Sequence, residues 1–465
     1  MIDPLVFDPD LIRRYDKAGP RYTSYPTAVQ FADDFRVPEF CAAARAGNSG
    51  ATAKPLSLYV HIPFCASPCF YCACTRVISR NSELADDYLH DLRLEIDRVS
   101  ELFDPARAVD QLHLGGGTPT FLTTAQLASL VSHLDRRFAL RRDPDREFAI
   151  EIDPRTVDEE RLKGLLGLGF NRLSLGVQDF DPRVQAAVNR VQSPAQTLQL
   201  IEFARSAGLR SLNVDLIYGL PLQTPESFAN TLRVINEARP DRIAVYSYAH
   251  LPDRFKAQRQ IARHQLPTAV DKLELFQLTV ETLTAAGYVY VGMDHFALPD
   301  DELVLAQRDS SLQRNFQGYS TRAACDLIGL GMSSISKMGD TYSQNFRTLA
   351  GYGAAIRAGD LATERGVALT RDDCLRREVI QSLMCELGVD FVAVERGYGI
   401  NFERYFNEEL NSLIPLQADG LVERRDRSVR VTGRGQLLVR NIAMVFDAYL
   451  GTQGNQAAPR YSRSI

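Results

Sequence analysis

The sequence predicts an α/β fold in which parallel strands form an open or closed barrel. Between about residues 56 and 250, short apolar runs rich in β-forming residues alternate with longer segments of helical periodicity. Such alternation implies parallel strands joined by right-handed crossovers. Cysteine, glycine and acidic residues stand directly after these apolar runs. Catalytic groups converge where the strands of a parallel barrel end, so we expect these residues to share one cavity.

Six apolar runs are predicted strands, and the segments between them are predicted helices. In the first helix, apolar residues from 84 to 102 recur three or four positions apart, and Asn81 or Ser82 is placed to cap its start. Two more helices with this spacing are predicted from residues 124 and 225 onward. The predicted strands cover residues 56–62, 111–114, 148–152, 172–177, 211–217 and 242–248.

The remaining chain is expected to form an arm, a small domain and a tail. Residues 1–54 are predicted to be an N-terminal arm that ends in a linker, followed by the barrel and its extensions over 55–360. Helical patterning returns in residues 361–450, which are predicted to be a small, mainly helical domain. Residues 451–465 are expected to be a flexible tail.

Within the small domain, helices are predicted over residues 372–387, 402–413 and 435–450, with a β-hairpin around a charged turn in 419–432. Helices combined with a β-wing suit a winged helix that binds nucleic acid, and they also suit a lid or support for the barrel. The mixed charges of the segment favour the lid or support.

Composition indicates a protein that needs no disulfides. The chain has 465 residues, 45% of them apolar, and only 8 cysteines, so a core can form without covalent bridges. The net charge of −5 is spread along the chain and offers no basic surface for nucleic acid. The first residues lack the features of a secretory signal, and no apolar run approaches the roughly 20 residues of a membrane span. We expect a cytoplasmic monomer with reduced thiols and no membrane partner.

Four cysteines lie within ten residues directly after the first predicted strand. Cys65, Cys69 and Cys72 have C-x3-C-x2-C spacing, and Cys74 follows two residues later. Thiolates are the soft ligands of iron–sulfur clusters, so three of them can hold three corners of a cubane and leave its fourth iron open. A zinc site normally takes four ligands from two separated pairs. A redox C-x-x-C pair would leave the other two cysteines without a role.

Residues after the later strands have both a binding and a structural interpretation. Gly115–Gly117 could let a ligand approach the backbone closely, or could form a tight turn. Glu151 could contact a ligand, or either it or Asp153 could cap the next helix. Arg190 could grip a carboxylate and Asp215 could accept from an amine or hydroxyl, or the two could form a structural ion pair.

These motifs together resemble those of a known family. The cysteine spacing, with Tyr71 just before the third cysteine, is similar to that of the radical S-adenosylmethionine superfamily. More narrowly, the chain resembles the oxygen-independent coproporphyrinogen III oxidases of haem biosynthesis over nearly its full length. The matching segments are 19–27, 59–65, 115–120, 151–154, 176–180, 215–221, 294–297 and 315–319.

The resemblance implies a fold and a reaction. The fold is a partial (βα)6 TIM-like barrel of the radical S-adenosylmethionine type. The reaction is oxidative decarboxylation of the ring A and B propionates of coproporphyrinogen III, which gives the vinyl groups of protoporphyrinogen IX by a 5'-deoxyadenosyl radical. It needs a tetrapyrrole substrate, an electron donor for the cluster and an electron acceptor that the sequence does not identify. Haem-binding chaperones of the same family are the alternative, but they typically lack the cysteine at position 74 and the N-terminal arm.

The resemblance also implies cofactors and site residues. One [4Fe-4S] cluster would be held by Cys65, Cys69 and Cys72, beside two molecules of S-adenosylmethionine. Cys74 would matter for activity without binding iron, and Tyr22 in the arm is expected to help shield the radical. The implied S-adenosylmethionine contacts are Tyr59, Tyr71, Gly115, Gly116, Gly117, Thr118, Glu151, Gln178, Arg190, Asp215, Ala249 and Ile335.

Overall fold

The computed structural model describes residues 3–48, 53–322, 325–451, 461 and 463, which divide into two compact units. The sheet unit spans 30–267 and 324–368, and the helical unit spans 1–29, 268–323 and 369–465. The predicted ranges were 1–54, 55–360, 361–450 and 451–465. The two units differ from them, because residues 268–323 were predicted to belong to the barrel and instead group with the C-terminal segment. The ranges stay a prediction of domain organisation. Most of the predicted tail, and residues 49–52 of the predicted linker, lie outside the described residues.

Parallel strands in the order β9, β8, β7, β6, β4, β1 and β14 form the centre of the sheet unit. All six predicted strands are confirmed as β1, β4, β6, β7, β8 and β9, and β14 was not predicted. Leu58 in β1 lies between Leu112 of β4 and Ile328 of β14. All three are fully buried, as expected for parallel strands covered on both faces. The strands of this unit are β1 (Leu56–Ile62), β2 (Phe64–Cys65), β3 (Val77–Ile78), β4 (Ala108–Gly116), β5 (Ala139–Leu140), β6 (Glu147–Ile152), β7 (Arg172–Gln178), β8 (Ser211–Tyr218), β9 (Arg242–Ser247), β14 (Asp326–Leu330), β15 (Ile335–Met338), β16 (Thr341–Asn345) and β17 (Thr363–Ala368).

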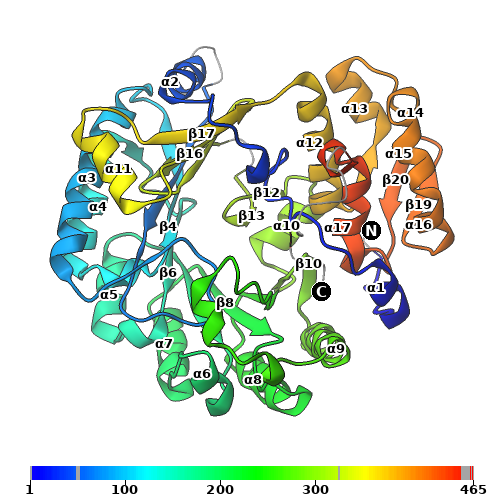
Figure 1. Ribbon diagram of the computed structural model, residues 1–465, viewed down its shortest axis with the longest axis horizontal. Helices are drawn as coiled ribbons and strands as arrows, with labels where there is room; N and C mark the ends of the chain where they lie inside the picture. The colour runs from blue at the N-terminus through cyan, green and yellow to red at the C-terminus, as the bar shows by residue number, and fades with distance from the viewer. Residues whose placement is uncertain (1–2, 49–52, 323–324, 452–460, 462, 464–465) are drawn as a thin grey trace. The chain divides into compact units, whose positions relative to one another are not determined.

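Helices α3 to α8 follow the parallel strands along the chain and lie on the outer side of the sheet (Figure 1). The predicted helices are confirmed as α3, α4 and α8. Asn81 is the cap of α3, because its side chain accepts a hydrogen bond from the Glu83 N–H. No helix in the described part of the chain is both long enough and apolar enough to cross a membrane. The α-helices of this unit are α2 (Val37–Ala46), α3 (Ser82–Ser100), α4 (Thr124–Arg137), α5 (Glu159–Gly167), α6 (Pro182–Ala187), α7 (Pro194–Ser206), α8 (Pro225–Ala238) and α11 (Leu349–Arg357).

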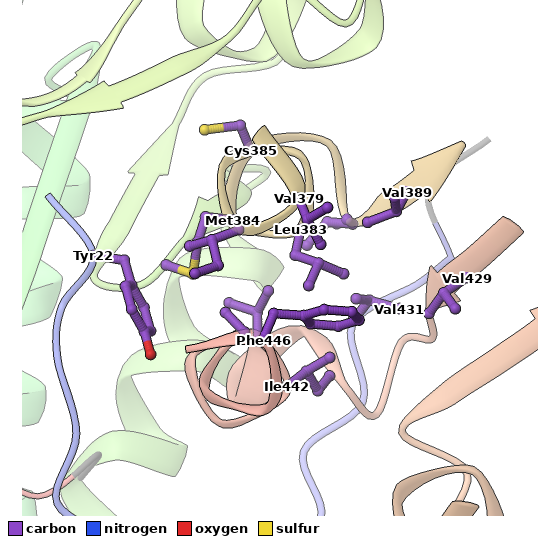
Figure 2. Close-up of a cluster of buried hydrophobic side chains, with 14 of the residues drawn as sticks. Tyr22, Val379, Leu383, Met384, Cys385, Val389, Val429, Val431, Ile442 and Phe446 are labelled. Carbon is purple, nitrogen blue, oxygen red and sulfur yellow. The ribbon is translucent and has the colours of Figure 1, made fainter. Parts of the chain in front are cut away.

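The helical unit is built around α12, which confirms the helix predicted over 372–387. Its buried face carries Val379, Leu383 and Met384, and these pack in one hydrophobic core with Ile442 and Phe446 (Figure 2). The predicted hairpin is confirmed as β19 and β20, and β18 adds a third antiparallel strand. The elements of this unit are α1 (Pro9–Tyr15), α9 (Ala269–Ala285), β10 (Val289–Gly292), β11 (His295–Ala297), α10 (Glu302–Arg308), β12 (Gln313–Asn315), β13 (Gly318–Ser320), α12 (Arg371–Glu386), β18 (Gly388–Asp390), α13 (Phe391–Tyr398), α14 (Phe402–Tyr405), α15 (Asn407–Ser412), α16 (Ile414–Ala418), β19 (Val422–Arg425), β20 (Ser428–Val431), α17 (Val439–Ala443) and α18 (Ala448–Gly451).

The single helix predicted over 435–450 is wrong. The segment forms α17 and α18 with two 3-10 turns, and Asp447 between them is extended, with φ −86° and ψ 104°. The Asp447 side chain accepts hydrogen bonds from the Tyr449 N–H and the Tyr22 hydroxyl. A short acidic side chain that bonds locally to the backbone competes with the helical conformation, which explains the break.

Candidate functional site

A pocket of about 440 Å³ lies in the sheet unit, where the carboxyl ends of β4, β6, β7 and β8 meet the cysteine loop. The expectation that these strand ends converge on one cavity is therefore confirmed. Of the residues implied by the resemblance, the pocket brings together twelve: Cys65, Cys69, Cys72, Cys74, Tyr71, Gly116, Gly117, Thr118, Glu151, Gln178, Arg190 and Asp215. The other residues that line it are Ala66, Ser67, Arg76, Pro119, Phe121, Ile152, Asp153, Arg155, Thr156, Ser174 and Gly176.

The cysteine loop is closed at its base by two short parallel strands. In this pair, β2 and β3 place Phe64 opposite Val77 and Cys65 opposite Ile78. Inside the loop, the Arg76 guanidinium donates to the backbone oxygens of Cys69 and Cys72, at 3.3 and 2.9 Å. The loop is therefore held by main-chain and arginine hydrogen bonds as well as by anything its sulfurs bind.

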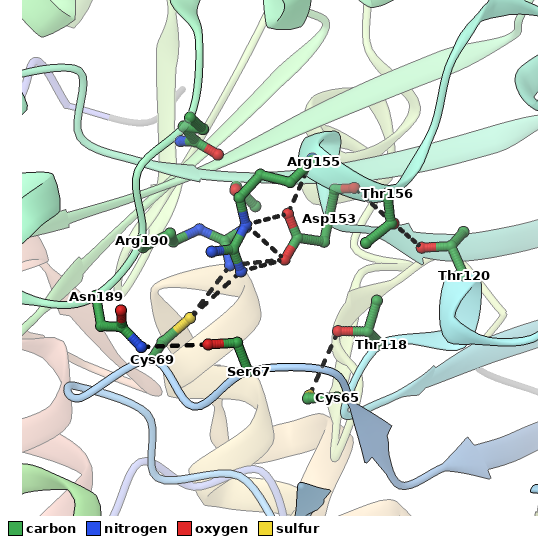
Figure 3. Close-up of polar contacts among 12 residues, drawn as sticks. Cys65, Ser67, Cys69, Thr118, Thr120, Asp153, Arg155, Thr156, Asn189 and Arg190 are labelled. Atoms are coloured by element: carbon green, nitrogen blue, oxygen red, sulfur yellow. Dashed lines mark hydrogen bonds and ion pairs between the residues drawn. The ribbon is translucent and has the colours of Figure 1, made fainter. Parts of the chain in front are cut away.

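Each of the three predicted ligand sulfurs lies near a hydrogen-bond donor. The Thr118 hydroxyl is 3.4 Å from the Cys65 Sγ, and the Cys74 N–H donates to the Cys72 Sγ at 3.4 Å. The Cys69 Sγ accepts from two arginines (Figure 3). A hydrogen bond from Cys74 is the first cause that lowers the pKa of Cys72 to about 6, whereas burial raises the pKa of Cys65 to about 11.

Three soft sulfur donors at one pocket fit a cubane cluster, in which each thiolate binds a different iron. Among the described residues, no three histidine, cysteine or acidic side chains gather closely enough to hold one metal ion.

The glycine run leaves no room for side chains. A Cβ at Gly115 would lie 2.6 Å from the Glu151 Oε1, and one at Gly117 would lie 2.6 Å from the Pro63 backbone oxygen. Gly116 has φ +117°, and a Cβ there would lie 2.6 Å from the His61 ring. The interpretation as an ordinary turn is therefore incomplete, because Gly116 and Gly117 also line the pocket wall with bare backbone.

Glu151 projects from the end of β6 and is held by two donors. His113 Nε2 lies 3.2 Å from its Oε1, and the Gly116 N–H donates to its Oε2 at 3.2 Å. Desolvation opposes ionisation, but these hydrogen bonds outweigh it and lower the pKa of Glu151. The Tyr59 ring stacks on His113 with centroids 5.7 Å apart, and its hydroxyl is 3.1 Å from the His61 Nδ1. The site thus contains an oriented, negatively charged carboxylate.

Asp153, and not Asp215, is the ion-pair partner of Arg190. The Arg190 Nη1 lies 3.1 Å from the Asp153 Oδ2. Asp153 also caps the 3-10 turn that follows it, because it accepts from the Arg155 N–H. Asp215 accepts instead from Ser174 and from an asparagine two residues before it, and desolvation raises its pKa to about 6. The proposed structural pair of Arg190 with Asp215 is therefore wrong, and the capping role falls to Asp153.

Five of the implied site residues are not among those that line this pocket in the described part of the chain: Tyr22, Tyr59, Gly115, Ala249 and Ile335. Ile335 begins β15, and the backbone oxygen of Ala249 accepts from Gln258. Tyr22 lies in the helical unit, is 1% exposed, and donates its hydroxyl to Asp447 at 2.9 Å. Burial is the first cause that raises its pKa well above the usual value.

Three residues that contact predicted site residues were not predicted from the sequence: Arg76, His113 and Arg155. Arg155 stands in the same strand-end turn as Asp153, so its position after a strand could have identified it. Arg76 and His113 carry no comparable signal in the sequence, because their roles depend on where the loop and β4 lie in space.

A parallel sheet with a three-cysteine loop after its first strand defines this chain as a radical S-adenosylmethionine protein, and the Radical SAM superfamily model matches residues 59–235. The HemN C-terminal domain model matches residues 369–438. The chain is 50% identical to the oxygen-independent coproporphyrinogen III oxidase of Pseudomonas aeruginosa over 100% of both chains, and 47% identical to that of Escherichia coli over 97% of both. The solved structure described as coproporphyrinogen III oxidase from Escherichia coli, a radical SAM enzyme, matches 96% of this chain and 99% of its own with a TM-score of 0.91. The chain belongs to the oxygen-independent coproporphyrinogen III oxidase family.

Proposed function

We infer that this chain catalyses the oxidative decarboxylation of the ring A and B propionates of coproporphyrinogen III to the vinyl groups of protoporphyrinogen IX, in haem biosynthesis. The observation that carries this inference is the full-length match to enzymes of that name. The pocket agrees with it, because three of its thiols can hold a cluster that generates a radical. A propionate β-carbon is unactivated, and acid–base groups alone cannot remove its hydrogen. A radical cofactor is required.

We propose Cys65, Cys69 and Cys72 as the ligands of one [4Fe-4S] cluster, with Cys74 required for turnover but not for iron binding. This proposal is supported by the position of all four cysteines in one pocket, and by hydrogen bonds to the Cys72 sulfur from both the backbone N–H and the side chain of Cys74. A cluster bound there would supply the electron for reductive cleavage of S-adenosylmethionine, which gives methionine and the 5'-deoxyadenosyl radical.

We propose that two molecules of S-adenosylmethionine bind along the strand ends. The bare backbone of Gly116 and Gly117 lets a ligand approach closely, and the Glu151 carboxylate can accept from its amine. Arg190 can donate to a carboxylate and Asp215 can accept from a hydroxyl. The further contacts proposed are Tyr59, Tyr71, Gly115, Thr118, Gln178, Ala249 and Ile335.

We also propose the molecules with which the enzyme reacts. The substrate is a tetrapyrrole, and the reaction requires an electron donor and an electron acceptor. The shielding role of Tyr22, the monomeric state and the cytoplasmic location stay predictions.

The test is an anaerobic incubation of the reconstituted protein with coproporphyrinogen III, S-adenosylmethionine, a reductant and an electron acceptor. We expect vinyl product together with 5'-deoxyadenosine. Stoichiometric haem binding without any product would identify the chain as a haem chaperone and overturn the proposal.

A further inference from the structure

Two arginines and one aspartate converge on the sulfur of Cys69. The Arg155 Nη2 lies 2.7 Å from the Asp153 Oδ2, and the Arg190 Nη1 lies 3.1 Å from the same oxygen. The same two nitrogens lie 3.7 and 3.5 Å from the Cys69 Sγ (Figure 3). Asp153 also accepts from the Arg155 Nε and N–H, so three donor atoms of this arginine bind one carboxylate.

The charges of this group do not cancel. Two guanidinium groups share a single carboxylate, which leaves one net positive charge beside the Cys69 sulfur. The side chains of Arg155, Arg190 and Asp153 are 25%, 8% and 9% exposed, so solvent screens them weakly. The sulfurs of Cys65 and Cys72 are hydrogen-bonded by neutral groups, the Thr118 hydroxyl and the backbone and side chain of Cys74, and the charge of Arg76 acts on both without a hydrogen bond to either.

A positive charge at one ligand has a direct electrostatic consequence. One-electron reduction adds one negative charge to an iron–sulfur cluster, so a fixed cation nearby favours the reduced form. Hydrogen bonds to the sulfurs and the charge around them are among the factors that set the potentials of such clusters. An arginine held beside Cys69 therefore raises the potential of a cluster bound there.

We propose that Arg155 is a positioning residue that acts through Cys69 to raise the reduction potential of the cluster, against the opposing negative charge of Asp153. This inference rests on the proposed function, in which Cys69 binds iron. Arg155 is a better residue for the test than Arg190, because Arg190 is also a proposed contact of S-adenosylmethionine. A substitution of Arg190 would not separate an effect on the cluster potential from an effect on cofactor binding.

The experiment is a potentiometric titration with dithionite as the one-electron donor, with the reduced cluster followed by electron paramagnetic resonance. It is made without substrate, and iron and sulfide contents are measured separately. The variants are R155Q, R155K and D153N. The matched control is R183Q, because Arg183 is an exposed arginine that pairs with Asp181 on the surface of the same unit.

We expect R155Q to lower the ratio of reduced to oxidised cluster at a fixed solution potential roughly tenfold, equivalent to about 59 mV for a one-electron couple. R155K keeps the charge and should stay close to the unmodified protein, as should R183Q. D153N removes the negative charge and should shift the potential in the opposite direction.

The proposal is overturned if R155Q, with its full complement of iron, titrates like the unmodified protein. It is also overturned if R155K shifts as far as R155Q, or if D153N shifts in the same direction as R155Q. If R155Q does not retain iron, the direction in which D153N shifts the reduction potential tests the proposal instead. Failure of the proposed function would be distinct, since it would appear as missing iron or missing vinyl product in the unmodified protein.

Discussion

Glu95, a buried acid in α3, offers a quantitative test of the sheet unit. Its Oε2 accepts from the Gly331 N–H at 2.6 Å and from the Tyr352 hydroxyl at 2.7 Å, and its Oε1 accepts from the Asn345 Nδ2 at 2.6 Å. Glu95 is 2% exposed, and burial raises its pKa from 4.5 to about 7. The carboxyl thus joins α3 to the turn after β14, which leads into Ile335.

The raised pKa fixes the sign of the pH dependence. Between pH 4.5 and about 7 the folded protein binds a proton at Glu95 that the unfolded chain has released. The contribution of this group to stability is therefore greatest below pH 4.5 and declines until the pH passes 7. For the change Glu95→Gln, the free energy of unfolding of the unmodified protein minus that of the variant should fall by about 2 kcal/mol between roughly pH 5.5 and pH 8.

The assay is urea denaturation followed by far-ultraviolet circular dichroism at both pH values, on the same preparation of each protein. Glu101→Gln, at an exposed glutamate just after α3, is the matched control and should leave the pH dependence unchanged. The reasoning fails if the unmodified protein and Glu95→Gln differ by the same free energy at both pH values, because Glu95 would then not change its protonation in this range.

Three further substitutions test the site and the core. Gly117→Ala places a methyl carbon 2.6 Å from a backbone oxygen and should lower vinyl product formation on the order of 100-fold, while Gly167→Ala, with nothing within 4 Å, should keep full turnover. Cys74→Ser should retain its iron, measured by iron analysis, and lose turnover; loss of iron would make Cys74 a ligand. Phe406→Ala empties a fully buried site and should lower the free energy of unfolding by about 3–5 kcal/mol in urea denaturation. Tyr405→Ala, at a side chain 42% exposed, should cost clearly less, and equal losses would contradict this account of the core.

The sequence was sufficient for the parallel sheet because its signal is local. The six predicted strands, β1, β4, β6, β7, β8 and β9, are short apolar runs that alternate with segments of helical periodicity, and Asn81 marked the start of α3. The positions of the strand ends then predicted which side chains would share the pocket, since all parallel strands end at the same edge.

The features that the sequence did not predict depend on partners distant in the chain. Arg190 lies 37 positions from Asp153, and the choice between this aspartate and Asp215 is made by the sheet. The hydrogen bond from the Tyr22 hydroxyl to Asp447 joins residues 425 positions apart. β14 returns beside β1 after more than 250 residues, and no local pattern encodes such a pairing.

The clasp formed by β2 and β3 has a consequence for damage and repair. The ends of the cysteine loop are joined by backbone hydrogen bonds, from Val77 to Pro63 and from Ser79 to Cys65, that involve no sulfur atom. We therefore expect the loop to stay closed at its base when iron is lost. Because the fold has already paid the entropy of closing the loop, we expect a new cluster to form there without refolding of the chain.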